Sequence, residues 1–243
     1  WPAMVQNCAS ENNYLSGSTS LGGIVGYAEY SAVRIKDCHT SGGSITSNGD
    51  NAGGIAGFMY HQENSSYIRS CYNETPVQAV NCAGGIVGYI RECIIDSCYN
   101  TAKVTATNEY SGGIAGQNKH NGHVRYCYNT GGVFVKNYGG GIVGAMIDGN
   151  SENVDYCFNL GNVTATGNRA GGIAGYSSTA SGTGGYVRHC FNAGIVKGVS
   201  QVGGILGAGG NPSNTTVRFS QNVNVAWVEG TSMVGAVCGY MPN

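Results

Sequence analysis

Charged residues are scarce in this sequence of 243 residues: they make up 10% of it, against about a quarter in an average globular domain. Twelve Lys and Arg stand against thirteen Asp and Glu, so the net charge is −1 at pH 7. Such a chain has no cationic field with which to hold nucleic acid or an acidic membrane surface. We therefore expect no nucleic-acid partner.

Long apolar runs are also absent. No stretch of about 18 apolar residues occurs, and Trp1 to Met4 do not resemble the start of a signal peptide. We expect no membrane insertion, and we interpret the chain as a segment of a longer protein whose flanking repeats or domains are its neighbours. Hydrophobic residues still make up 41% of the sequence, which is enough to build a core.

Glycine, by contrast, is plentiful, with 42 residues, and it marks an internal repeat. A Gly-Gly-apolar-small-Gly block recurs every 28 to 32 residues, and its copies begin at Gly22, Gly53, Gly84, Gly112, Gly140, Gly171, Gly203 and, in decayed form, Gly235. A second block, apolar-x-x-Cys-aromatic-Asn, lies between them. Its cysteine is Cys71, Cys98, Cys127, Cys157 or Cys190, with weaker copies at Cys8, Cys38 and Ser220.

Short β-branched runs follow the cysteines, as at 104–107, 133–135 and 163–166. Together with the two blocks they predict three short strands per unit, because no helical periodicity appears. The period near 30 residues suits one coil of a parallel β-solenoid. The main alternative is a propeller, whose blades need about 40 residues. We predict an all-β, parallel, right-handed β-solenoid of seven to eight coils.

The solenoid is predicted to be a single domain over 1–243. Residues 1–21 lack a glycine block and form an atypical N-terminal part, 22–234 contain the repeats, and 235–243 form a degenerate last repeat.

Stacking at about 4.8 Å per coil places equivalent residues in columns. The third position of the glycine block gives an aliphatic column that we expect inside: Ile24, Ile55, Ile86, Ile114, Ile142, Ile173, Ile205 and Val237. A second interior column lies three residues before each cysteine: Val5, Ile35, Ile68, Ile95, Val124, Val154, Val187 and Val217. This apolar residue and the cysteine have opposite parity along a strand, so we expect a bend or bulge between them.

An asparagine ladder is predicted two residues after the cysteines, at Asn73, Asn100, Asn129, Asn159, Asn192 and Asn222. Each side chain is expected to bond its own turn and the neighbouring coils. The paired glycines indicate positive φ or a close approach of backbone.

The cysteines predict a second ladder, at Cys38, Cys71, Cys98, Cys127, Cys157 and Cys190. Parallel Cβ vectors disfavour disulfides between stacked coils, so we expect free, mostly buried thiols. Pairing that involves Cys82, Cys93 or Cys238 stays open. Free thiols on an exported protein indicate an anaerobic habitat.

Charged residues form a column two before each cysteine: Lys36, Arg69, Asp96, Arg125, Asp155, Arg188 and Arg218. We expect it to face solvent as a ladder of opposite charges. An alternative is the carboxylate pair of a glycosidase, because Asp96 and Asp155 would lie roughly 9.6 Å apart at about 4.8 Å per coil. Arg125 between them should keep both ionised, so no catalytic residue is predicted.

No cofactor or metal is predicted. His120 and His123 could approach His61 from two coils away, but no further ligand is evident.

Loop length varies mostly between the glycine pair and the next cysteine, so insertions collect on one edge, at 58–67, 176–186 and 208–216. Variable loops rich in Tyr, Asn, Ser and Gly are typical of polar recognition, although plain turns have the same composition. The candidate ligand-binding residues are Phe58, Tyr60, His61, Tyr67, Tyr176, Tyr186 and Asn211. The aromatic columns either stack to cover the solenoid or offer a glycan platform.

The blocks Gly-Gly-Ile-Val-Gly-Tyr (22–27, with a copy at 84–89) and Cys-Tyr-Asn-Thr (98–101 and 127–130) resemble the GLUG-motif repeats of bacterial surface and secreted proteins, including adhesin-like chains. The resemblance implies a non-catalytic extracellular module, either an adhesin or a spacer that displays one. Its expected partner is a host or microbial surface glycan or protein, contacted through the variable loop edge. The alternative is a polysaccharide lyase or glycoside hydrolase on a solenoid.

Overall fold

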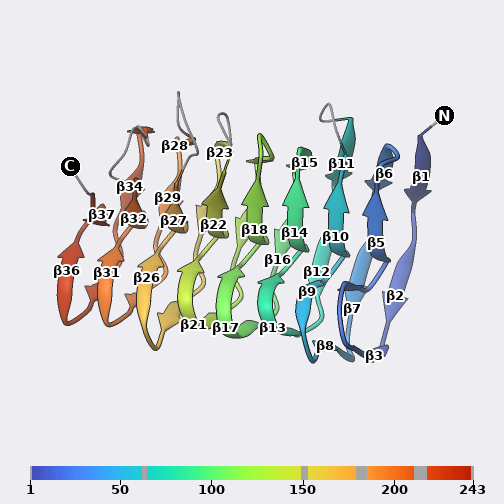
Figure 1. Ribbon diagram of the computed structural model, residues 1–243, viewed down its shortest axis with the longest axis horizontal. Coiled ribbons are helices and arrows are strands. Elements are labelled where there is room, and N and C mark those ends of the chain that lie inside the picture. The colour runs from blue at the N-terminus through green and yellow to red at the C-terminus, as the bar shows by residue number, and fades with distance from the viewer. Residues whose placement is uncertain (1, 62–64, 149–152, 179–184, 211–217, 242–243) are drawn as a thin grey trace.

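A computed structural model describes residues 2–61, 65–148, 153–178, 185–210 and 218–241. Every regular element in these ranges is a β-strand. The chain winds in successive coils that stack side by side from the N-terminal end to the C-terminal end (Figure 1). The predicted parallel β-solenoid is thereby confirmed, because every strand pairing is parallel and joins neighbouring coils.

Four sheets run the length of the stack, named here sheets A to D in the order in which each coil visits them. Sheet A contains β1 (Ala3–Gln6), β6 (Val33–Lys36), β11 (Ser66–Arg69), β15 (Cys93–Asp96), β19 (His123–Arg125), β23 (Asn153–Asp155), β28 (Tyr186–Arg188) and β33 (Arg218–Ser220). Sheet B contains β2 (Ala9–Glu11), β7 (His39–Ser41), β12 (Tyr72–Glu74), β16 (Tyr99–Asn100), β20 (Tyr128–Asn129), β24 (Phe158–Asn159), β29 (Phe191–Asn192) and β34 (Val223–Asn224).

Sheet C is the largest, because in some coils its strand is divided in two. It contains β3 (Tyr14–Gly17), β8 (Ser44–Ser47), β13 (Val77–Gly84), β17 (Val104–Gly112), β21 (Val133–Gly140), β25 (Val163–Ala165), β30 (Val196–Lys197) and β35 (Val228–Glu229). The separate second pieces are β4 (Leu21–Gly22), β9 (Asp50–Gly53), β26 (Asn168–Gly171), β31 (Ser200–Gly203) and β36 (Ser232–Gly235). Sheet D contains β5 (Val25–Glu29), β10 (Ala56–Tyr60), β14 (Val87–Arg91), β18 (Ala115–Lys119), β22 (Val143–Ile147), β27 (Ala174–Ser177), β32 (Leu206–Gly209) and β37 (Cys238–Tyr240).

The number of strands per coil differs from the expected three. The cysteine block forms two strands, one before and one after the cysteine, so each coil has four sides. The N-terminal part belongs to the stack as well from Ala3 onward, because β1 pairs with β6, β2 with β7 and β3 with β8.

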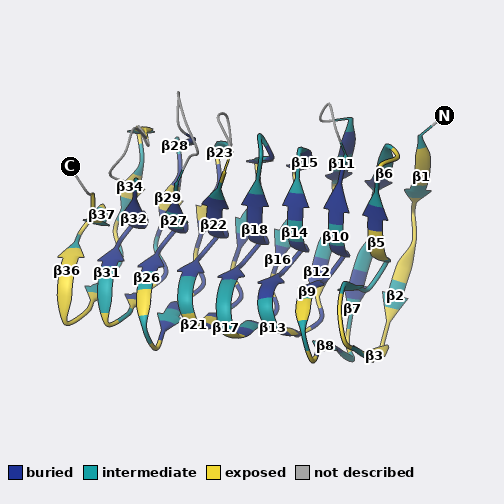
Figure 2. Ribbon diagram, viewed as in Figure 1, coloured by how far each residue is buried: buried dark blue, intermediate teal, exposed yellow. Residues whose placement is uncertain are grey.

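Both predicted aliphatic columns line the interior (Figure 2). Ile55 to Ile205 of the glycine block and Ile35 to Val187 of the cysteine block are fully buried in the described coils. Sheet C adds a separate apolar cluster around Val104, Val133 and Val163. At the C-terminal end Val237 is 46% exposed, so the last coil covers the core without being covered itself.

A left-handed residue separates sheets A and B in every coil and supplies the predicted bend. It stands directly before the cysteine position, with φ between 51° and 55°: Asn7, Asp37, Ser70, Ser97, Tyr126, Tyr156, His189 and Gln221. A second left-handed residue turns the chain at the end of sheet C, with φ between 50° and 67°: Ser20, Asn51, Cys82, Tyr110, Tyr138, Arg169, Gln201 and Met233. A non-glycine residue rarely adopts this conformation, so each coil has two demanding corners.

Close approach of backbone, and not positive φ, explains the glycine pairs. A Cβ on Gly85 would lie 2.1 Å from the carbonyl oxygen of Gly113 and 2.4 Å from Cγ of Asn100. The equivalent glycines of neighbouring coils show the same contacts, which leaves no room for any side chain.

The last coil departs from the predicted alignment by two residues. Val187 pairs with Phe219, Arg188 with Ser220 and Asn192 with Asn224. The prediction that Ser220 replaces the cysteine and that Asn222 continues the asparagine ladder is therefore wrong. Asn222 takes the cysteine position, where its Oδ1 accepts the Cys190 N–H at 2.9 Å. Arg218 likewise leaves the charged column and pairs with Tyr186, and Val217 lies outside the described residues.

Candidate functional site

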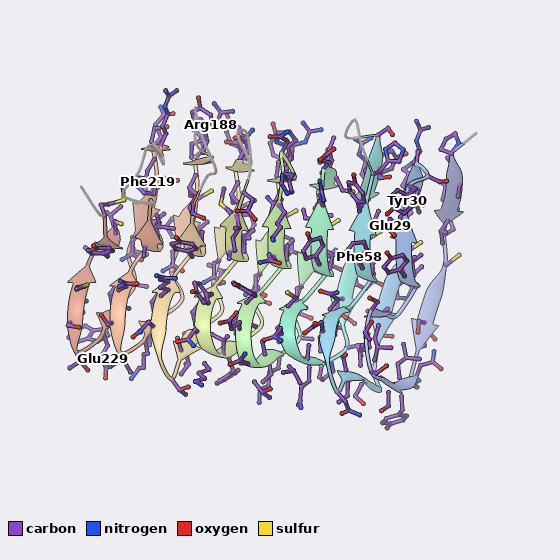
Figure 3. The ribbon with its side chains drawn as sticks, in the orientation of Figure 1. Glu29, Tyr30, Phe58, Arg188, Phe219 and Glu229 are labelled. Carbon is purple, nitrogen blue, oxygen red and sulfur yellow. The ribbon has the colours of Figure 1, made fainter. Side chains whose placement is uncertain are left out.

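The predicted ligand-binding residues lie on different faces of the solenoid. Phe58 and Tyr176 share one outward column of sheet D, with Tyr89, Gln117 and Ala145 between them. Figure 3 shows Phe58 on this face, well away from Arg188, the last residue of β28 in sheet A. Tyr67 and Tyr186 share an outward column of sheet A instead. Asn211 lies outside the described residues.

The edge between sheets D and A carries aromatic and cationic side chains in contact. The Arg91 guanidinium lies 4.5 Å from the ring centre of Tyr60, and that of Arg69 lies 4.8 Å from the ring centre of Tyr67. Ser65 Oγ lies 2.8 Å from Nδ1 of His61. Such cation–π contacts hold these rings against the fold.

Sheet B carries a continuous aromatic ladder. The rings of His39, Tyr72, Tyr99, Tyr128 and Phe158 stack with centroids 4.7 to 5.0 Å apart and interplanar angles of 2° to 6°. Rings stacked this closely hide their faces in one another and leave only edges to solvent. A sugar ring needs a free aromatic face, so the ladder acts as a cover for the solenoid, the first of the two roles expected for it.

The charged column is a chain of ion pairs. Asp96 lies 2.9 Å from Arg125 and 3.4 Å from Arg69, and Asp155 accepts both guanidinium contacts of Arg188. The arginine side chains are about 40% exposed, whereas that of Asp96 is 11% exposed. Solvent therefore reaches the cations, but the predicted exposure is wrong for Asp96. Burial alone would raise the pKa of Asp96, but Ser97 and Arg125 outweigh it and hold the pKa below its usual value.

All ten cysteines are free thiols, as predicted for the ladder, and no disulfide joins Cys82, Cys93 or Cys238. The ladder thiols are buried, and each donates to a carbonyl, as Cys127 Sγ does to Arg125 O at 3.1 Å. Burial raises the pKa of Cys98, Cys127 and Cys157 well above the ordinary value. These thiols are structural and unreactive.

The asparagine ladder is fully hydrogen-bonded. Asn129 accepts from Asn100 Nδ2 at 2.8 Å and donates to Asn159 Oδ1 at 2.9 Å and to Gly131 O at 2.8 Å. The same bonds recur from Asn73 to Asn224. This ladder faces inward and is not available to a ligand.

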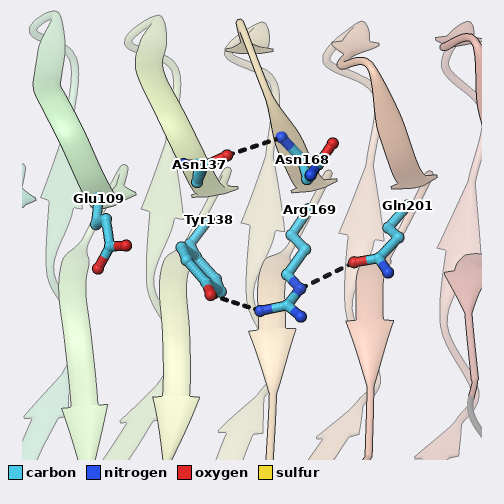
Figure 4. A pocket seen from close by; sticks show the side chains of 6 residues that line it. All are labelled: Glu109, Asn137, Tyr138, Asn168, Arg169 and Gln201. Carbon is cyan, nitrogen blue, oxygen red and sulfur yellow. Dashed lines mark hydrogen bonds between the residues drawn. The ribbon is translucent and has the colours of Figure 1, made fainter.

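A groove follows the corner at the end of sheet C, where the strand holds the second left-handed residue of its coil before the chain turns into sheet D. One hollow of about 370 Å³ is lined by residues that include Asp50, Asn81, Tyr89, Glu109, Tyr110 and Gln117. A second hollow, of about 240 Å³, is lined by Glu109, Asn137, Tyr138, Asn168, Arg169 and Gln201 (Figure 4). The hollows share Glu109, and we call them together the corner groove.

The walls of the corner groove come from two adjacent columns. Asp50, Asn81 and Glu109 stand in register on consecutive coils, and each precedes its left-handed residue. This column was not predicted because its residue types vary from coil to coil. A usable signal was present, since a polar residue stands three before almost every glycine pair.

Among the described residues, no three His, Cys, Asp or Glu side chains lie close enough together to hold a metal ion. In the same part of the chain no helix is long and apolar enough to cross a membrane.

Comparison with known proteins adds one structure. No protein-family model and no curated protein matches this chain. Its fold is similar to that of a putative immunoglobulin A1 protease from Bacteroides ovatus, with a TM-score of 0.57 and 18% sequence identity. The match covers 96% of this chain and 67% of the other. At this identity the likeness concerns the fold alone.

Proposed function

We propose that the chain is a non-catalytic module of an extracellular bacterial surface protein, either an adhesin or a spacer that displays one. The observation that carries the proposal is the set of ladders along the stack. Aliphatic, thiol, asparagine and aromatic columns each join neighbouring coils, which suits a stiff rod that holds a contact surface away from a cell. The GLUG resemblance and the bacterial neighbour of similar fold are in keeping with this role.

The proposed contact surface includes the edge between sheets D and A, with His61 and Tyr67, whereas Tyr60 is only 8% exposed and supports the Arg91 side chain. Its partner would be a host or microbial glycan or protein. The test is adhesion of beads coated with the purified chain to mucus, epithelial cells and bacteria. We expect beads with the intact chain to adhere, and the double variant His61→Ser/Tyr67→Ser to adhere less. Tyr14→Ser is the matched control, since Tyr14 is 81% exposed on sheet C. Beads that adhere no better than uncoated ones would leave only the spacer role.

We also propose that the protein works where oxygen is scarce, because ten free thiols suit an exported protein only in a reducing or anaerobic habitat. Thiol titration of the denatured, unreduced protein should find all ten. A markedly lower count would contradict the proposal.

The alternative of a carbohydrate-active enzyme has weaker support. A general acid must carry a proton at working pH, and the lowered pKa of Asp96 works against this. The protein of similar fold is named as a putative immunoglobulin A1 protease, so proteolysis is a second activity to test. We expect no cleavage of polysaccharides or of immunoglobulin A1 by the purified chain. Cleavage that Asp96→Asn abolishes would favour the enzyme.

A further inference from the structure

The corner groove deepens the recognition role proposed above, on which this inference rests. We propose that the corner groove binds one extended chain of a neutral glycan, lying along the stack of coils. The site is distinct from the loop edge between sheets D and A, and its lining comes from regular strands and from the left-handed residues beside them.

A glutamine at the wall of the groove has hydrogen-bonding capacity to offer a ligand. Gln117 of β18 is only 6% exposed and lines the larger hollow. Its Oε1 receives a weak contact from the Cys82 thiol at 3.8 Å, and its amide nitrogen has no hydrogen-bond partner among the described residues. Tyr89 beside it is similar: burial raises the pKa of its hydroxyl to about 12, and no bond to that hydroxyl is present in the same ranges. Both polar groups are in contact with solvent in the groove, so a ligand hydroxyl would replace water there.

The lining matches the chemistry of a sugar. Asn81 already donates to Asp50 Oδ1 at 2.8 Å and accepts from Asn108 Nδ2 at 3.0 Å. The groups that remain for a ligand are the carboxylate oxygens of Asp50 and Glu109 and the amide of Gln117, which between them accept and donate hydrogen bonds. Sugar hydroxyls do both as well, so vicinal hydroxyls can pair with these groups. The ring of Tyr89 adds apolar surface against which the C–H groups of a sugar ring can pack.

The charges of the groove favour a neutral sugar over an acidic one. The larger hollow is lined by Asp50 and Glu109 and by no cation. In the smaller hollow, Arg169 donates to Tyr138 Oη at 2.5 Å and to Gln201 Oε1 at 2.8 Å, so its guanidinium is largely engaged (Figure 4). A ligand carboxylate or sulfate would face two carboxylates with little compensation.

The repeat of the groove favours a polymer. Equivalent polar side chains recur at each coil, roughly every 4.8 Å, from Asp50 to Asn168. A chain of sugar units can meet such a series with successive hydroxyls. An extended peptide usually pairs with a free strand edge, and along this groove the backbone groups already bond between coils.

The experiment is binding of the purified chain to an array of immobilised neutral glycans (glucans, mannans, galactans and chitin fragments) beside polygalacturonate and heparin. We expect retention on at least one neutral class and none on the acidic polymers. Tyr110→Asn and Glu109→Gln should each weaken that binding at least tenfold. Asn tolerates the left-handed conformation of Tyr110, and Glu109 lies on the surface, so both variants should fold, which circular dichroism checks.

Tyr126→Asn is the matched control. Tyr126 is also left-handed and also stacks on a tyrosine of the next coil, with centroids 5.3 Å apart against 4.8 Å for Tyr110 and Tyr138, but it lies between sheets A and B. It should bind as the unchanged chain does.

Four results would each overturn the proposal. They are equal losses for the two tyrosine variants, preference for an acidic polymer, capture of peptides in place of sugars, and no binding to any neutral glycan. If beads adhere to cells but Tyr110→Asn beads adhere equally, the groove proposal fails and the adhesive role stands. If no beads adhere, the adhesive role fails whatever the array shows.

Discussion

The two left-handed corners of each coil share a backbone conformation and differ in everything around it. Between sheets A and B, the carboxylate of Asp96 is paired with arginines of both neighbouring coils, and the cysteine and asparagine behind it are buried and bonded. Near the end of sheet C, the equivalent Glu109 forms no ion pair with any described residue, and the wall beside it contains Gln117, whose only bond in the described part of the chain is the weak contact from the Cys82 thiol. One corner is closed and the other is hollowed.

The difference arises from the residues that follow each left-handed position. At the A–B corner a cysteine and then an asparagine turn inward and fill the space with hydrogen-bonded side chains. At the C–D corner a small residue and two glycines follow, and their backbone lies against the next coil. The interior there accommodates only small side chains such as Ser111, so the larger polar side chains stay outside and form walls. The same turn therefore serves stability at one corner and leaves a surface for recognition at the other.

The largest loss of stability is expected at the paired glycines, whose second member lies against the asparagine ladder. Gly85→Ala should cost at least about 4 kcal/mol or prevent folding, because its Cβ would lie 2.1 Å from a backbone oxygen. Gly132→Ala is the control: there the nearest atom is the movable ring of Phe134 at 3.0 Å. Urea unfolding followed by circular dichroism measures both. Similar losses for the two variants would show that close approach is not what selects glycine at Gly85.

Replacing an amide by leucine should lower the stability strongly at the A–B corner and hardly at all at the C–D corner. Asn129→Leu removes four hydrogen bonds of a buried network and should lower the free energy of unfolding by about 3 to 5 kcal/mol. Gln117→Leu removes an amide whose nitrogen has no partner in the described part of the chain, and should change stability by less than about 1 kcal/mol. Equal losses in urea unfolding would mean that the two corners are not different in this respect.

Lowering the pH should destabilise the fold through the A–B corner, where Asp96 is paired with arginines. Because the folded-state pKa of Asp96 is lowered, its pairing stabilises the fold above the unfolded pKa of about 3.9 and is lost as the pH falls through the folded value. At pH 7, Asp96→Asn should be about 1 to 3 kcal/mol less stable than the unchanged chain, and the gap should close in strong acid. Glu109→Gln, which breaks no ion pair among the described residues, should change stability at pH 7 by less than about 0.5 kcal/mol. A gap for Asp96→Asn that persists unchanged at pH 2 would contradict this account.

Most of the fold follows from the sequence because one residue per coil occupies each column. Ile86, Cys98 and Asn100 repeat in type, so the residue pattern alone is enough to align their columns and place them inside. The last coil was misaligned because both Asn222 and Asn224 satisfy the asparagine pattern, and only the pairing of backbones distinguishes them. The candidate ligand-binding residues are predicted from loop lengths. A loop length does not specify the sheet on which a side chain lies.

The corner groove could not be foreseen, for a physical reason. Its geometry depends on left-handed Tyr110, Cys82 and Arg169, and bulky side chains give no local sign that they adopt this conformation. The unpaired state of Gln117 is a tertiary property, set by neighbours from other coils.

The smallest change in stability is expected at the left-handed residue that both corners share. Ser70 at one corner and Ser20 at the other have φ values of 52° and 53°. Glycine relieves the left-handed strain but loses more chain entropy on folding, so Ser70→Gly and Ser20→Gly should each stabilise by up to about 1 kcal/mol. Thermal unfolding measures the two variants side by side. A gain at one corner with a clear loss at the other would show that the turns are not equivalent.

The alternation of charge in sheet A makes neighbouring coils non-interchangeable. Arg69, Asp96, Arg125, Asp155 and Arg188 succeed one another along the stack, and the interior position after the block isoleucine alternates in step, as Val87, Ala115, Val143, Ala174 and Leu206. Coils with arginine have the larger interior residue, and coils with aspartate have alanine. Removing one coil would place like charges side by side and two residues of similar size in contact, whereas removing two restores both patterns. The five coils from Arg69 to Arg188 therefore repeat in pairs, whereas Lys36 and Arg69, register partners one coil earlier, carry the same charge.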